Sequence, residues 1–89
     1  MKILILASGK GTNAANIIKL AKQGYFKNPE ILALISDNQN AHALEMAAKN
    51  SVRAIWLDSG KKGAFFSPEG AALYVKTVQE LNPDLIVLA

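Results

Sequence analysis

Residues 3–13, ILILASGKGTN, determine the architecture, because an unbroken apolar run passes directly into a loop that contains two glycines. Such an apolar run is typical of a strand that is covered on both faces of a parallel sheet. From Ala14 onward, apolar residues recur at helical spacing, at positions 14, 17, 18, 21 and 25, and Gly24 is expected to help end that helix. The segment therefore predicts a strand, a tight loop and a helix.

The rest of the chain repeats the alternation of apolar strand and amphipathic helix. Apolar runs at 31–35, 54–57 and 85–88 predict three further strands. Between the first two of these runs, a second helix is expected on a stripe of small and aliphatic side chains: Ala41, Leu44, Ala47 and Ala48.

The third helix has clear start and stop signals. Ser67-Pro68-Glu69 supplies a hydroxyl cap, a proline at the first helical position and an acid in the first turn. Asn82-Pro83 is expected to end the helix. Its inner face is expected to be formed by four side chains: Ala71, Tyr74, Val75 and Val78.

The element order β-α-β-α-β-α-β predicts an α/β fold with a Rossmann-like parallel sheet, right-handed crossovers and helices on both faces. We expect the strand order 3-2-1-4, which places the ligand-binding switch point between the first and fourth strands. The last run, 85–89, has the apolar character of a fully buried central strand, so we expect the fold to be truncated after the fourth strand. The alternative is a small three-layer domain whose last strand is an edge.

Composition limits the classes of function. The chain of 89 residues has no cysteine, which excludes disulfides, thiolate catalysis and cysteine-ligated zinc, and its one histidine cannot form a multi-histidine metal site. The formal charge of +3 comes from scattered basic residues, so we expect no nucleic-acid partner. The apolar run at 3–7 is too short for a membrane span or a signal peptide. We therefore expect a cytoplasmic protein with no membrane partner.

The loop Ser8-Gly9-Lys10-Gly11-Thr12-Asn13 is the most informative segment. Its glycines let the backbone turn sharply and let a ligand approach closely. The main-chain amides of Gly11, Thr12 and Asn13 would then point outward at the start of the first helix, where the helix dipole favours a phosphate. The alternative is a tight turn in which Thr12 or Asn13 only caps the helix, and the residues alone leave both interpretations open.

Of two other nucleotide-binding motifs, the sequence excludes the first and satisfies the second. A P-loop is excluded, because Leu4 stands where its first glycine is needed and Gly11 stands where Ser or Thr must follow the lysine. The dinucleotide fingerprint G-x-G-x-x-A is satisfied by residues 9–14, and Asp37 at the end of the second strand is placed to hold a ribose. The alternative function is therefore a nicotinamide-dinucleotide-binding domain of a small oxidoreductase.

Three segments together form a more specific pattern. They are the S-G-x-G-[ST]-N loop at 8–13 followed by Asn16-Ile17-Ile18, the turn Ser36-Asp37-Asn38 followed by Leu44-Glu45, and the closing run Pro83-Asp84-Leu85-Ile86-Val87-Leu88-Ala89. In this combination the chain resembles the phosphoribosylglycinamide formyltransferase family of purine biosynthesis, across essentially all of its residues.

The resemblance implies transfer of a formyl group from 10-formyltetrahydrofolate to the amino group of glycinamide ribonucleotide. Residues 1–89 would be the N-terminal, phosphate-binding part of a single formyltransferase domain, with the ribonucleotide 5′-phosphate on Gly11, Thr12 and Asn13. The family's catalytic Asn, His and Asp and its main folate-contacting segment follow the strand that ends here at Ala89. The resemblance therefore assigns no catalytic residue to this chain, and we expect the C-terminal catalytic part to be absent and the chain alone to be inactive.

One position departs from the family pattern. Many members have a basic residue near the start of the third helix that reaches toward the folate, and Pro68 stands at that place here. Lys61 or Lys62 is the candidate substitute.

Other conspicuous residues have structural explanations. His42 is expected to lie on the surface of the second helix and not to be the family's catalytic histidine. Trp56 and Phe65-Phe66 are expected to pack in the core or against loops rather than to stack on a ligand.

Two further interpretations of the whole chain stay open. The first is a non-enzymatic α/β module that assembles through its open sheet edge, and the same edge would allow self-association. The second is a relative that formylates tRNA or a pyrimidine, although the glycine loop favours a small phosphorylated substrate.

Overall fold

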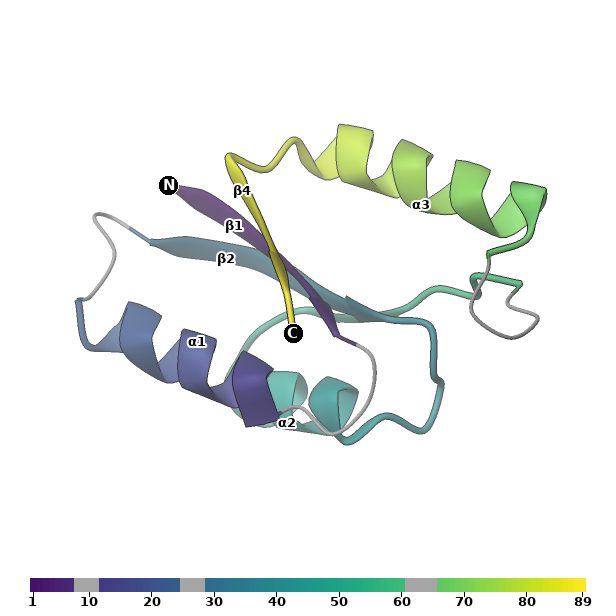
Figure 1. The fold of residues 1–89 in the computed structure, drawn as a ribbon. Coiled ribbons are helices and arrows are strands. Elements are labelled where there is room, and N and C mark those ends of the chain that lie inside the picture. Colours follow the sequence, from purple (N-terminus) through teal and green to yellow (C-terminus); the bar gives the residue numbers. More distant parts are fainter. Residues whose placement is uncertain (8–11, 25–28, 61–65) are drawn as a thin grey trace.

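Strands and helices alternate along the chain, as the sequence predicts. The computed structural model describes residues 1–7, 12–24, 29–60 and 66–89. Its elements follow in the order β1 (Lys2–Ala7), α1 (Thr12–Lys22), β2 (Glu30–Ser36), α2 (His42–Lys49), β3 (Ala54–Trp56), α3 (Pro68–Leu81) and β4 (Leu85–Leu88) (Figure 1).

The strands form one parallel sheet in the order β3-β2-β1-β4, which confirms the predicted Rossmann-like topology. The chain builds outward from β1 to β3 and then crosses back to place β4 on the other side of β1. Leu6 lies opposite Leu88 in this last pairing. The reversal creates a switch point between β1 and β4, where open sheets of this kind bind ligands at their carboxyl edge.

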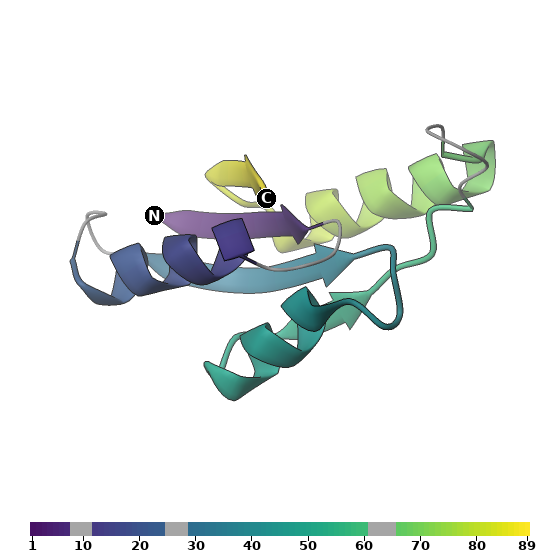
Figure 2. The same ribbon diagram turned by 60° about the horizontal axis from the view of Figure 1, so that its bottom comes forward.

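Helices cover both faces of the sheet, with α1 and α2 on one side and α3 on the other (Figures 1 and 2). Successive residues of β1 therefore enter different cores. Ile3 and Ile5 are fully buried in the cluster that contains Ala14 of α1. Leu4 belongs to the second cluster, on which Val78 of α3 packs. This burial on both faces explains why β1 is apolar throughout.

The inner face of α3 matches the predicted set only in part. Tyr74, Val78 and Leu81 pack against the core beneath the helix. Val75 is 56% exposed, so its predicted place on the inner face is wrong. Each helical residue is rotated by about 100° from the one before it, and Val75 therefore lies on the flank of the stripe that Tyr74 and Val78 define.

The fourth strand forms as predicted, but in this chain it is less buried than its apolar sequence suggests. β4 is hydrogen-bonded to β1 alone and forms an edge of the sheet. Ile86 is 44% exposed and Leu88 is 78% exposed, whereas Val87 packs against the cluster beneath α1. The difference arises because the core under α3 is built from residues of β1, β2 and β3.

Three hydrogen bonds hold α3 and β4 in place. The main-chain N–H of Lys2 donates to Asp84 Oδ2 at 2.7 Å, and the N–H of Asp84 donates to the carbonyl oxygen of Lys2 at 2.8 Å. At the other end of α3, the N–H of Ser67 donates to the carbonyl oxygen of Ser59 at 3.0 Å. These contacts fix the start of β4 against β1 and the start of α3 near the carboxyl edge of the sheet.

Candidate functional site

The predicted phosphate site lies where β1 is followed by α1. β1 ends at Ala7 and α1 begins at Thr12, directly after the glycine loop. Gly11 lies outside the described residues, as does the side chain of Thr12, while Asn13 is exposed in the first turn of the helix. The amino end of α1 therefore follows the carboxyl end of β1 at the position that the sequence predicts.

The charge distribution along α1 favours an anion at its amino end. Its first turn contains no acidic residue, and its last turn contains Lys19 and Lys22. The basic residues complement the negative end of the helix dipole, and no carboxylate in the helix itself offsets the positive end. By contrast, α2 has Glu45 and α3 has Glu69 in the first turn.

The amino end of α3 is already satisfied by its own residues. The N–H of Gly70 donates to the Ser67 hydroxyl at 2.9 Å, and Pro68 has no N–H to offer. This confirms the predicted capping arrangement at residues 67–69. It also leaves the amino end of α1 as the better anion site of the two.

Asp37 lies just after β2, as the dinucleotide alternative requires, and is tied to the loop that follows β3. Its carboxylate Oδ2 accepts a hydrogen bond from the Ser59 hydroxyl at 3.1 Å, and its main-chain carbonyl accepts one from Trp56 Nε1 at 3.1 Å. Ser59 is almost completely buried. The carboxylate is therefore held in a defined position at the carboxyl edge.

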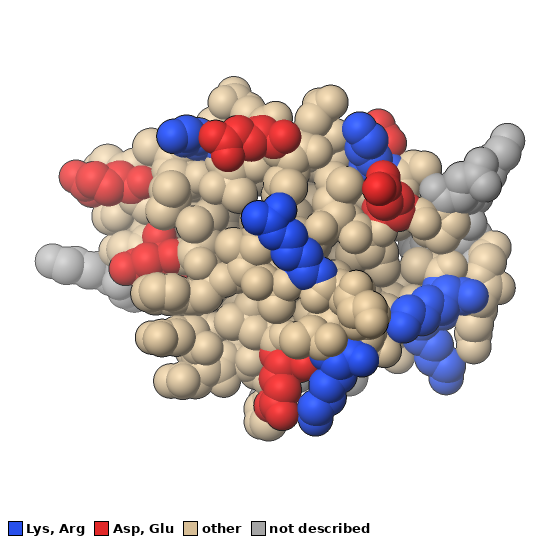
Figure 3. Space-filling model, turned by 180° about the vertical axis from the view of Figure 1, so that it is seen from behind, with Lys and Arg blue, Asp and Glu red and all other residues tan. Residues whose placement is uncertain are grey.

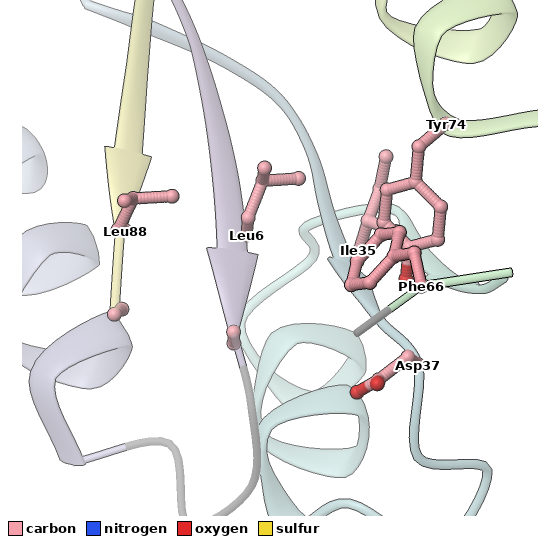
Figure 4. Close-up of a pocket in the computed structure, with 8 residues that line it drawn as sticks. Leu6, Ile35, Asp37, Phe66, Tyr74 and Leu88 are labelled. Carbon is pink, nitrogen blue, oxygen red and sulfur yellow. The ribbon is translucent and has the colours of Figure 1, made fainter. Parts of the chain in front are cut away.

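A hollow opens beside Asp37 on the α3 side of the sheet, and residue patterns alone did not predict it (Figure 4). Leu6 and Leu88 line one side, and Phe66 and Tyr74 line the other. These residues are distant in sequence and meet only through the crossover between β3 and β4. Gly70 in the first turn of α3 is a related signal, but it marks the close approach of that helix to Ser59 and not the hollow itself.

Tyr74 is a neutral hydrogen-bond donor in this hollow. Its hydroxyl donates to the carbonyl oxygen of Leu57 at 2.8 Å. Burial, reinforced by the negative charges of Asp37 and Asp58, raises the pKa of Tyr74 to about 12. The phenol therefore stays protonated at neutral pH.

Several residues that the sequence singled out have structural roles. His42 has an 82% exposed side chain on α2, with Nδ1 3.9 Å from Glu45 Oε2, which confirms its predicted surface position. Phe66 packs edge-on against Tyr74, with ring centroids 4.9 Å apart, as expected for a loop-packing residue. Trp56 is 47% exposed, so it is not a core residue, although its indole is anchored to the turn at Asp37.

The position of the missing basic residue is partly described. Pro68 is the first residue of α3, where the resemblance predicts a basic residue. Lys61 and Lys62 lie outside the described residues, as does Phe65. The proposed replacement of the basic residue by a lysine therefore stays a prediction.

Charges of both signs are mixed on the face shown in Figure 3, where lysine and arginine side chains lie beside aspartate and glutamate. Among the residues that the structure describes, three or more potential metal ligands are nowhere gathered together. Within the same residues, each helix is too short or too polar to cross a membrane.

Comparison with known families gives a match over the entire chain. The sequence model described as "Formyl transferase" matches residues 1–89. The glycine loop, the Asp37 turn and the closing strand therefore all lie inside the matched region.

Solved structures show the same fold at moderate sequence identity. Glycinamide ribonucleotide transformylase 1 from Symbiobacterium toebii is 29% identical, with a TM-score of 0.84, and the match covers 100% of this chain and 41% of that one. The phosphoribosylglycinamide formyltransferases from Coxiella burnetii and Bacillus halodurans are 29% and 31% identical, with TM-scores of 0.85 and 0.82. Both matches cover 100% of this chain. They cover 40% of the Coxiella burnetii chain and 44% of the Bacillus halodurans chain. The chain thus spans less than half the length of these structures.

Proposed function

The chain belongs to the formyl transferase family, and we propose that it forms the N-terminal, phosphate-binding part of a phosphoribosylglycinamide formyltransferase. The observation that supports this proposal most directly is the family match over residues 1–89, together with the three structures of that activity. The reaction would move a formyl group from 10-formyltetrahydrofolate to the amino group of glycinamide ribonucleotide, a step of purine biosynthesis.

In this proposal, the start of α1 holds the 5′-phosphate of the ribonucleotide. The residues assigned to it are Gly11, Thr12 and Asn13. Support comes from the position of Thr12 as the first residue of α1 and from the absence of an acid in the first turn of that helix. Main-chain amides and the helix dipole would then stabilise the phosphate together.

The phosphate contact would contribute binding energy and orientation rather than bond chemistry. In the whole reaction the substrate amine attacks the formyl carbon and a tetrahedral oxyanion develops. A phosphate held far from the reacting nitrogen orients the ribonucleotide without taking part in the step itself. Loss of that contact would weaken substrate binding.

We propose that residues 1–89 alone do not catalyse the transfer. Their one histidine, His42, is exposed at the start of α2, with Nδ1 3.9 Å from Glu45 Oε2. The formyl donor 10-formyltetrahydrofolate is proposed from the family alone, and none of the described residues is assigned to it. A cytoplasmic location and self-association through the β4 edge are further parts of the proposal.

The phosphate site can be tested by adding a charge to the first turn of α1. Asn13→Asp places a carboxylate beside the proposed phosphate. We expect glycinamide ribonucleotide to bind at least about tenfold more weakly, equivalent to about 1.4 kcal/mol. The same substitution should leave the stability unchanged or raise it by about 0.3–1 kcal/mol, because an acid at a helix amino end is favourable. Isothermal titration and thermal unfolding measure the two effects.

Asn16→Asp is the matched control, because Asn16 is also exposed on α1 but lies beyond its first turn. It adds the same charge and should change the affinity much less. Equal weakening by the two substitutions would contradict a local phosphate contact. Saturable binding of NAD with no response to glycinamide ribonucleotide would instead favour the dinucleotide alternative, which the position of Asp37 after β2 supports.

A further inference from the structure

We draw no further inference here: the strongest candidate, the hollow beside Lys22 and Asn50 at the carboxyl ends of α1 and α2, carries nothing, because the one cation among the described residues that line it is an exposed lysine whose ammonium group already donates to Asn50.

Discussion

At the level of single residues, Gly70 shows how one missing side chain sets the position of a helix. A Cβ at this residue would overlap the carbonyl oxygen of Ser59, which belongs to the loop after β3. That oxygen also accepts the N–H of Ser67, so the loop cannot easily move away. The glycine thus permits the contact that brings α3 to the carboxyl edge.

Gly70→Ala is expected to destabilise the chain by about 1–3 kcal/mol, the usual cost of forcing extra volume into a packed site. A loss of stability in Gly70→Ala would be informative, because alanine in a helix normally stabilises by about 1 kcal/mol relative to glycine. Chemical unfolding measures the difference. Ala72→Ser, on an exposed position of the same helix, should stay within about 0.5 kcal/mol. A stabilised Gly70→Ala variant would show that the loop can yield.

Asp84 has a comparable role at the start of β4. Its carboxylate accepts the Lys2 N–H at 2.7 Å, so Asp84→Ala should cost about 1 kcal/mol and speed hydrogen exchange in residues 85–88. Asp84→Asn retains an acceptor oxygen for the Lys2 N–H and should lose less stability than Asp84→Ala. A loss in Asp84→Asn as large as that in Asp84→Ala would contradict the hydrogen-bonding role. This contact also gives the Pro-Asp pair of the closing segment a structural reason.

At the level of elements, α3 connects the hollow to the stability of the fold through Tyr74. The pKa of this residue is raised to about 12, so the folded state retains the phenolic proton at a pH where the unfolded chain, with an ordinary tyrosine pKa of about 10, has lost it. The contribution of the neutral Tyr74 phenol to the stability of the folded state is therefore complete below about pH 10. It is lost as the pH rises toward about 12. Urea unfolding across this range should show the decline, and Tyr74→Phe should remove most of it. An equal decline in Tyr74→Phe would exclude Tyr74 as the cause.

The order of the elements could be predicted from the sequence because its signals are local. The apolar run of β1, the glycine loop and the Ser67-Pro68 cap each depend on a few neighbouring residues, and right-handed crossovers then restrict the possible strand orders. Burial could not be predicted in the same way. Val75 and Leu88 are apolar, but their exposure depends on where α3 lies across the sheet. The hollow was missed for the same reason, because Leu6, Phe66 and Leu88 meet only in the folded chain.

At the level of the whole molecule, the two edges of the sheet differ in how they are protected. β3 is only Ala54–Trp56, and Arg53 and Asp58 lie close to its ends. Short edge strands with nearby charges are poor templates for pairing with another chain. β4 has no charged residue and no proline, and it exposes Ile86 and Leu88 beside its open hydrogen-bonding edge. We therefore propose that two copies of the chain pair through β4, and a twofold arrangement would make the strands antiparallel and the interface closed.

This difference predicts a dimer whose mass, measured by light scattering, rises with chain concentration. Leu88→Lys places a charge on the edge and should keep the chain monomeric over the same range, because a lysine on each copy would be brought toward its counterpart. Leu73→Lys is the matched control, since Leu73 is 42% exposed but lies on α3 beside Gly60 and Ser67. If Leu73→Lys abolished the dimer equally, the interface would involve α3 and not the strand. A parent chain that stays monomeric at every concentration would show that the four residues of β4 bury too little surface to hold two copies together.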